Sequence, residues 1–316
     1  MDVEIDRDNP VAGAPGAGRE EAGFAGSSGE SLTMAANPWW RGRRLVTMAL
    51  LLPAVCFLTV WFIVPMARLL DLSLSDPQGS TYAYREILGN EVYRRVFLNT
   101  LILSVNVTLI CIVIAYPTAY ILSRLKGVAL ALLFYCVLFP FLTSVLVRTF
   151  SWMLLLERSG PINRLLMFSR MVDHPVQLLF NNTGVYIGMV HVLLPYAILP
   201  MYAAMVAVDE RLLLASEGLG ASPLKTFLGV YLPLTFPGAA AGAAFVFLLA
   251  LGFFITPTLL GGLNNLTVAM LIDLFVSERL VWSLAAAASF CLLAIIILLL
   301  LTVSRFLNIG RFLVTR

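Results

Sequence analysis

Charge is scarce in this chain of 316 residues. Only 12% of its residues are Asp, Glu, Lys or Arg, whereas 60% are hydrophobic and the mean hydropathy is +0.91. In soluble domains about a quarter of the residues are charged. The composition therefore excludes an ordinary soluble protein and indicates a chain whose solvent is a lipid bilayer.

Lysine is nearly absent. Lys126 and Lys225 are the only two lysines, and each follows a leucine. A phosphate-binding loop of the Gly-Lys-Ser/Thr type is therefore excluded. If the protein uses ATP, another polypeptide must bind it, and we expect no cofactor in this chain.

Cysteine and histidine are too few to suggest a metal centre or a catalytic site. The cysteines at positions 56, 111, 136 and 291 lie in apolar runs, where they pack as small hydrophobic side chains. His174 and His191 give neither the spacing of metal ligands nor a partner for a nucleophile. We expect no metal, no catalytic residue and no nucleic-acid partner, and nothing supports a membrane enzyme.

Long apolar runs dominate the rest of the sequence. Six of them reach the roughly 20 residues that cross about 30 Å of hydrocarbon. Because lipid offers the backbone no hydrogen bonds, each run is predicted to be a helix, and the fold class is all-α integral membrane with six transmembrane helices. The runs are 45–70, 97–122, 127–146, 186–206, 238–260 and 282–303.

The first 43 residues differ from the rest. They are acidic, rich in Gly, Ala and Ser, and almost free of large apolar side chains before Trp39. Such a segment buries too little surface to offset ordering, so residues 1–43 are predicted to be a disordered tail and 44–316 a single membrane domain.

The flanking cations bear on orientation. The raw numbers on the two sides are almost equal, but the cations are denser on the side that would hold the N-terminus. This favours a cytoplasmic N-terminus and C-terminus. The cytoplasmic cations would be Arg41, Arg43, Arg44, Arg124, Lys126, Arg211, Lys225, Arg305, Arg311 and Arg316.

A polar-edged segment, residues 209–238, separates the fourth and fifth runs, and we call it the coupling segment. Asp209 is predicted to cap a short helix that continues to about Glu217. Gly218 and Gly220 permit the left-handed conformations that end such a helix.

A second short helix is predicted in the same segment. Ser222 and Pro223 suit its N-cap and first position, and it would continue through Phe227. The pairs 232–233 and 237–238 would then mark the entry into the fifth run. The expected result is a helix–turn–helix lying across the membrane face.

Part of the coupling segment follows a known spacing, Glu-Ala-Ala, three residues, Gly, nine residues, Ile-x-Leu-Pro. The residues at this spacing are Ala215, Gly220, Val230, Leu232 and Pro233, and Ser216 replaces the second Ala. The segment thus resembles the cytoplasmic "EAA" loop of binding-protein-dependent ABC importer permeases, the loop that contacts the ATPase. Leu214 stands where the family usually has Glu, and Glu217 on the same helical face is predicted to substitute. The resemblance implies ATPase-coupling roles for Leu214, Ala215, Ser216, Glu217, Gly220, Val230, Leu232 and Pro233.

Three further segments resemble the spermidine/putrescine branch of these permeases. Asn99-Thr100 opens the second run, residues 140–166 contain an Arg-Thr-x-x-Trp signature ending at Trp152, and residues 251–262 read LGFFITPTLLGG. The substrate implied is a polyamine, with phosphonates, opines and ferric iron as alternatives, since the branch also includes carriers of these solutes.

This resemblance implies a type I ABC importer permease fold in the bacterial inner membrane. The partners implied are an ATPase dimer, a second permease subunit and an extracytoplasmic solute-binding protein. The pathway would lie between the two permeases. The alternative is a secondary transporter or channel acting alone, although the runs contain almost no charge and show no clear repeat.

Polar or aromatic side chains within the runs are candidates for the substrate pathway. These are Asn106, Thr143, Tyr196 and Phe253. Hydrogen bonding between helices is an alternative role for the polar ones. His191 is predicted to be a packed neutral imidazole.

Three more candidates are predicted outside the runs. Trp152 and Glu157 would lie just past the third run on the outer side, and Asp273 lies before the last run. A polyamine would use an aromatic face, at about 0.5–2 kcal/mol, together with a carboxylate. Interface anchoring for Trp152 and ordinary loop charges for the two acids are the alternatives.

Overall fold

The structure is a computed structural model, and it describes residues 50–262 and 265–307. The predicted tail, residues 1–43, lies outside the described residues. Residues 50–58 belong to a different compact unit from residues 59–307, so the fold is described for the larger unit.

The described residues form helices and connecting turns, without any strand. The helix over residues 50–58 continues into the π-helix η1. The elements are η1 (Thr59–Ile63), α2 (Val64–Leu74), α3 (Tyr82–Gly89), α4 (Glu91–Arg124), α5 (Gly127–Leu142), α6 (Val145–Leu156), α7 (Pro161–Phe168), α8 (Asn182–Val206), α9 (Glu210–Gly218), α10 (Pro223–Thr226), η2 (Phe227–Tyr231), α11 (Leu232–Leu251), α12 (Ile255–Leu260), α13 (Val268–Asp273), η4 (Leu274–Glu278) and α14 (Trp282–Leu307).

Five continuous helices in the described part are long and apolar enough to cross a membrane. They cover Leu50–Leu74, Glu91–Arg124, Asn182–Val206, Pro223–Leu251 and Trp282–Thr302. A bent pair, Gly127–Leu142 with Val145–Phe168, brings the number to six if it counts as one span. The all-α membrane fold class is confirmed.

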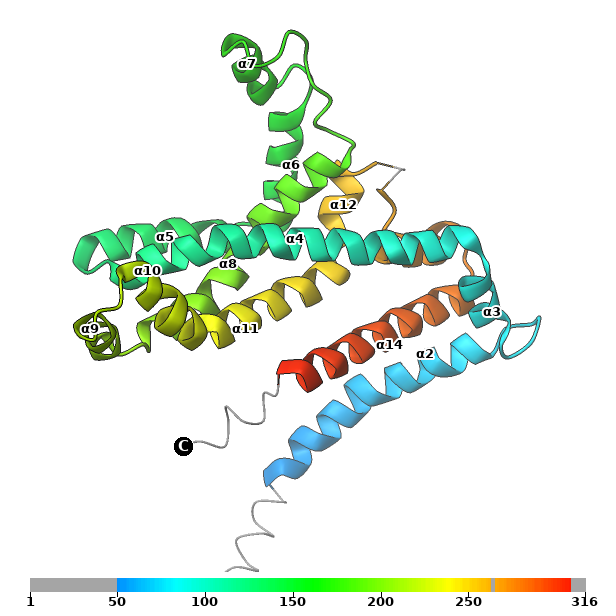
Figure 1. Ribbon diagram of the computed structural model, residues 1–316. Helices are drawn as coiled ribbons and strands as arrows, with labels where there is room; N and C mark the ends of the chain where they lie inside the picture. Colours follow the sequence, from blue (N-terminus) through cyan, green and yellow to red (C-terminus); the bar gives the residue numbers. More distant parts are fainter. Residues whose placement is uncertain (1–49, 263–264, 308–316) are drawn as a thin grey trace, which may run out of the picture. The chain divides into compact units, whose positions relative to one another are not determined.

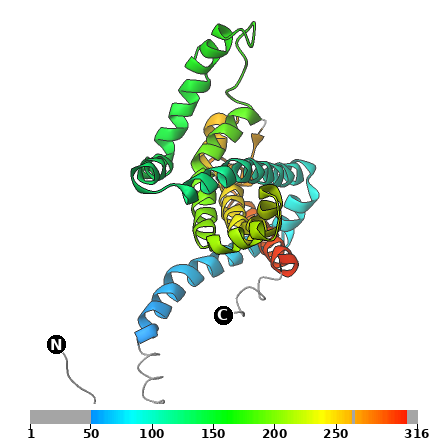
Figure 2. The same ribbon diagram turned by 60° about the vertical axis from the view of Figure 1, so that its left-hand side comes forward.

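Helices α4, α8 and α11 pack side by side and form the main core (Figures 1 and 2). Glycines on α11 allow the close approach to α8. A Cβ at Gly238 would lie 2.3 Å from the Ala204 Cβ, and one at Gly242 would lie 2.8 Å from the Ala197 carbonyl oxygen. Small residues at a helix crossing are the usual means of packing membrane helices tightly.

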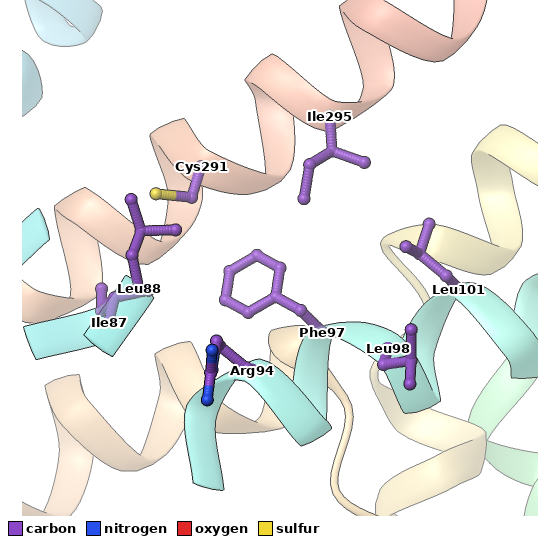
Figure 3. Close-up of a pocket in the computed structure, with 8 residues that line it drawn as sticks. All are labelled: Ile87, Leu88, Arg94, Phe97, Leu98, Leu101, Cys291 and Ile295. Atoms are coloured by element: carbon purple, nitrogen blue, oxygen red, sulfur yellow. The ribbon is translucent and has the colours of Figure 1, made fainter. Parts of the chain in front are cut away.

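A second core cluster joins α3 and the start of α4 to α13, η4 and α14. An apolar cavity of about 180 Å³ opens beside it, between α3, α4 and α14 (Figure 3). Phe97 stands near the middle of this view, and Arg94 is the one charged side chain among the labelled lining residues. None of the predicted pathway residues lines this cavity.

The third predicted span, 127–146, is not one continuous helix. Helix α5 ends at Leu142, and the chain turns by 98° into α6. Thr143 has an extended backbone, and its hydroxyl and backbone N–H both donate to the Pro140 carbonyl, at 2.8 Å and 3.3 Å. These bonds satisfy a carbonyl at the end of α5. The contacts of α6 with α8 and α12 stabilise the new direction of the chain.

The fifth predicted span, 238–260, is also wrong at both ends. The helix starts at Pro223 and runs through α10, η2 and α11 to Leu251. Gly252, Phe253 and Phe254 then interrupt it, and α12 is a separate short helix.

Candidate functional site

The coupling segment begins with the predicted short helix, α9. The Asp209 carboxylate accepts a hydrogen bond from the Arg211 backbone N–H at 2.9 Å, which confirms Asp209 as the N-cap. The helix ends at Gly218, one residue beyond the predicted end.

The turn after α9 depends on one glycine. Gly220 has φ +89°, the left-handed region that favours glycine, and its N–H bonds the Glu217 carbonyl. Gly218, expected to take the same conformation, is helical instead. The prediction for Gly220 is confirmed, and that for Gly218 is wrong.

The second helix of the segment is longer than predicted. The Ser222 hydroxyl accepts from the Lys225 backbone N–H, and Pro223 occupies the first turn, as expected. The helix does not end near Phe227 but continues into the membrane-spanning helix. The segment therefore consists of one short helix, α9, and a tight turn that leads into the helix of the fifth span, which begins at Pro223.

Two polar contacts connect α9 to the spanning helices. The Ser216 hydroxyl lies 3.1 Å from that of Thr226 on α10, which is buried. Arg124, at the end of α4, pairs with Glu210 in the first turn of α9 at 3.3 Å. The short helix is thus connected to both α10 and α4.

An aromatic cluster supports the Arg124 end of this connection. The guanidinium carbon lies 5.4 Å from the Tyr120 ring centroid and 5.5 Å from that of Tyr231. Phe227 meets Tyr116 and Tyr120 edge-on and stacks on Tyr231. Cation–π and edge-to-face contacts both stabilise such an arrangement.

The widened turn η2 lies in the same region. Within it, the Leu232 N–H bonds the Phe227 carbonyl five residues back. Pro233 has no backbone N–H that could donate to a carbonyl of the preceding turn. A π-helical turn often occurs where the regular series of helical hydrogen bonds is interrupted.

The predicted coupling residues divide into two groups. Ser216, Val230 and Leu232 are half-buried, while the others are exposed. Leu214 is 67% exposed, and Leu219 at the turn is 90% exposed. Large apolar side chains displayed on a polar segment are typical of a surface that a partner covers. The exposed coupling residues are Leu214, Ala215, Glu217, Gly220 and Pro233.

Two predicted pathway residues, Trp152 on α6 and Tyr196 on α8, lie on helices that pack against each other. The Trp152 indole N–H donates to the His191 Nδ1 at 2.9 Å, and the rings meet edge-on. Tyr196 contacts Phe141 at a centroid distance of 5.1 Å. Trp152, Tyr196 and Phe253 are half-buried against the same core cluster. This aromatic group offers ring faces suited to a cation.

Trp152 itself is placed differently from the prediction. It lies within α6, after the break in the third span, and not in a loop beyond a completed span. His191 is hydrogen-bonded as well as packed. Thr143 lies at the break, half-buried, with its hydroxyl bound to the Pro140 carbonyl.

Asn106 stands apart from the aromatic group. Its side-chain amide donates to the Tyr186 hydroxyl at 3.0 Å and links α4 to α8. This contact matches the alternative of hydrogen bonding between helices.

The two candidate acids are not brought to the aromatic group. Glu157 is exposed at the C-terminal end of α6. Asp273 is exposed at the end of α13 and accepts from the Ser277 hydroxyl at 3.0 Å.

Sequence reasoning missed Arg148 as a site residue. It lies one helical turn before Trp152, within electrostatic range of His191 and Tyr196. Its Nε and Nη1 atoms are buried without a hydrogen-bond partner among the described residues. A charged residue within an otherwise apolar run was the signal available.

The family model described as "Binding-protein-dependent transport system inner membrane component" matches residues 87–309. The spermidine/putrescine permease protein PotB of Escherichia coli K12 is 35% identical over 224 residues, 70% of this chain and 82% of PotB. PotB of Haemophilus influenzae is 34% identical over 265 residues, 81% of this chain and 91% of that protein.

Solved structures show the same fold. A bacterial ABC transporter involved in the import of the acidic polysaccharide alginate matches with a TM-score of 0.67 at 17% identity. That match covers 89% of this chain and 100% of the other. The alginate transporter in complex with a periplasmic protein bound to an alginate pentasaccharide gives a TM-score of 0.70 at 17% identity, over 85% and 96% of the two chains. The expected ABC importer permease fold is confirmed.

Proposed function

Because the chain belongs to the family of binding-protein-dependent transport system inner membrane components, we propose that it forms one half of the pathway of an ATP-driven polyamine importer. The chain is a multi-pass permease subunit of an ABC importer. Its substrate is proposed to be spermidine, putrescine or a similar small polycation.

The relatives and the predicted pathway residues both support a polyamine as the transported substrate. The PotB proteins, about a third identical to this chain over most of their length, are named for spermidine and putrescine. The rings of Trp152, Tyr196 and Phe253 lie against one core and supply the faces that attract ammonium groups. Phosphonates and opines carry anionic groups, which the faces of aromatic rings do not attract. The described residues hold no group of three His, Cys, Asp or Glu side chains that could bind ferric iron.

The proposed partners are an ATPase dimer, a second permease and a solute-binding protein outside the membrane. ATP hydrolysis is assigned to the ATPase, since no Gly-Lys-Ser/Thr sequence occurs in this chain. Both termini and α9 are assigned to the cytoplasmic side, in keeping with the denser cations on that side.

The attachment of α9 is the observation that carries the coupling role. A docked ATPase would push on the exposed residues of α9, and the Arg124–Glu210 and Ser216–Thr226 contacts would pass that motion to α4 and α10. Because α10 is continuous with α11, motion at the turn reaches the helix that ends beside Phe253. Glu217, exposed on α9, is proposed to supply the carboxylate that the motif usually places at position 214.

Reconstitution tests this proposal. The chain is purified with the products of the neighbouring transport genes, placed in liposomes with ATP enclosed, and supplied with radiolabelled spermidine and the binding protein outside. We expect uptake that requires both ATP and the binding protein. Uptake that proceeds without either one, or accumulation of an opine or phosphonate but not of polyamines, would refute it.

A further inference from the structure

We propose that Arg148 forms a carboxylate-binding site within the membrane, and that the second permease subunit supplies the carboxylate. This inference rests on the proposed function, because it requires a second permease. It concerns a residue for which the coupling segment and the aromatic group give no role.

Among the described residues, no acidic side chain pairs with Arg148. Helix α6 packs against α7, α8 and α12, and none of these helices contains Asp or Glu. The nearest acid in sequence is Glu157, more than two helical turns along, exposed and past the end of α6. The ion pairs in the described part of the chain, Arg95–Glu91 and Arg124–Glu210, do not involve it.

The guanidinium is also poorly satisfied by neutral groups. Its Nε and Nη1 atoms are buried without a hydrogen-bond acceptor among the described residues. The neighbouring Thr149 hydroxyl is already engaged with Val145 and Thr256. A guanidinium stays charged in proteins, and intramembrane cations pair with an acid or face a watery cavity. Nη2 is not among these buried atoms, and it is therefore the part of the half-buried guanidinium that a carboxylate from another subunit can reach.

The position of Arg148 argues against a lipid phosphate. The side chain interacts electrostatically with His191, which lies nine residues into α8. Nine residues correspond to about 13 Å of helix, well below the end of the span where headgroups lie. A protein carboxylate on a facing span can reach that depth.

The proposed substrate argues against a transported anion. Arg148 lies one helical turn from Trp152 and near Tyr196, so an unpaired guanidinium would repel a polycation from the aromatic faces. A carboxylate from the second permease would remove this repulsion and would tie the two halves of the pathway together. A carboxylate of the second permease would thus neutralise the Arg148 charge and let a polycation approach the aromatic faces.

Two experiments on the complete reconstituted complex test the inference. In the first, R148Q and R148E are assayed for spermidine uptake beside R164Q, a control at an exposed arginine on α7. We expect at least a tenfold loss for both Arg148 variants and unchanged uptake for R164Q. Each Asp and Glu in or near the spans of the second permease is then changed singly to Lys in the R148E background. One of these changes should restore uptake.

The second experiment does not depend on transport. Arg148→Cys is combined with a cysteine at each of those acidic positions, in subunits whose native cysteines are replaced. The membranes are then treated with a short thiol-specific bifunctional reagent, because a paired arginine and carboxylate hold their Cα atoms beyond the reach of a direct disulfide. We expect a covalently linked pair of permeases at one of these acidic positions, the same one that restores uptake in the first experiment. Wild-type uptake by R148Q, failure of every acid-to-Lys change, or the absence of any cross-link would overturn the inference. Absence of spermidine uptake by the wild-type complex would refute the polyamine proposal alone, since a cross-link from Arg148→Cys to one acidic position would still show the contact.

Discussion

Arg124 and Glu210 lie 86 positions apart in the chain, and their side chains meet at 3.3 Å. The pair joins the last turn of α4 to the first turn of α9, and the Tyr120 and Tyr231 rings flank the guanidinium. A long spanning helix and the short exposed helix are thereby connected through one ion pair. The proposed coupling of ATP hydrolysis to transport depends on connections of this kind.

Removing the Glu210 charge should weaken transport more than stability. Both partners are accessible to solvent, so E210Q should change the free energy of unfolding by about 1 kcal/mol or less. If that energy holds α9 to α4 during the transport cycle, uptake should fall by about two- to fivefold. Spermidine uptake and thermal unfolding in detergent measure the two effects.

The second ion pair of the described chain provides the control. Glu91 and Arg95 are close at 2.6 Å, and Glu91 is about as exposed as Glu210. This pair lies at the opposite end of α4 from Arg124. E91Q should leave uptake unchanged. Equal losses for E210Q and E91Q would mean that surface charge in general, and not the α4–α9 connection, matters.

Gly220 should be needed for the turn after α9, whereas Gly218 should not. A Cβ at either position meets no atom within 4 Å, so the two differ in backbone conformation only. G220A forces a non-glycine residue into the left-handed region at a cost of about 1–2 kcal/mol. We expect G220A to lower binding-protein-stimulated ATP hydrolysis and G218A, in the helix, to leave it intact. A larger loss in G218A than in G220A would show that the turn does not depend on Gly220.

Gly238 should be essential to the contact between α11 and α8. An added methyl group would lie 2.3 Å from the Ala204 Cβ and 2.9 Å from the Pro200 carbonyl oxygen. Such overpacking typically costs about 1–3 kcal/mol. G238A should therefore lower the melting temperature in detergent, while G229A, whose methyl group would meet nothing within 4 Å, should not lower it. A melting temperature unaffected by G238A would contradict the tight crossing.

Trp152 should act in transport mainly through its ring. W152F keeps an aromatic face but loses the hydrogen bond to His191, worth about 0.5–1.5 kcal/mol, and should retain most uptake. W152A loses both and should raise the spermidine concentration for half-maximal uptake by up to about thirtyfold, since ring attraction to a desolvated cation reaches about 2 kcal/mol. F150A, an exposed aromatic on the same helix, is the matched control. The same loss in F150A and W152A would assign the effect to membrane packing.

Local features of this fold could be predicted from the sequence, because their causes lie within a few residues. Asp209 and Ser222 cap the helices that follow them, and Gly220 adopts the left-handed turn. Each depends on one side chain and the nearest backbone groups. The long apolar runs likewise indicate helices wherever lipid is the solvent.

Helix ends inside the membrane could not be predicted in the same way. The apolar run continues past Leu142 and past Leu251, yet α5 and α11 end there. The break after Leu142 is stabilised by contacts of α6 with α8 and α12, which lie far along the chain. The hydropathy of a run does not show which distant helices it will contact. The Arg124–Glu210 pair and the Trp152–His191 bond were missed for the same reason.

Cross-linking from the turn after α9 tests most directly whether this turn meets the ATPase. Leu219 is 90% exposed at that turn, and L219C in a chain without its native cysteines can carry a short photoreactive group. In membranes containing the whole importer, we expect one main product, in which this chain is joined to the ATPase subunit, with a yield that changes when ATP is added. A product with the solute-binding protein, or labelling of the same cysteine by a membrane-impermeant reagent from the outer side, would contradict the proposed coupling.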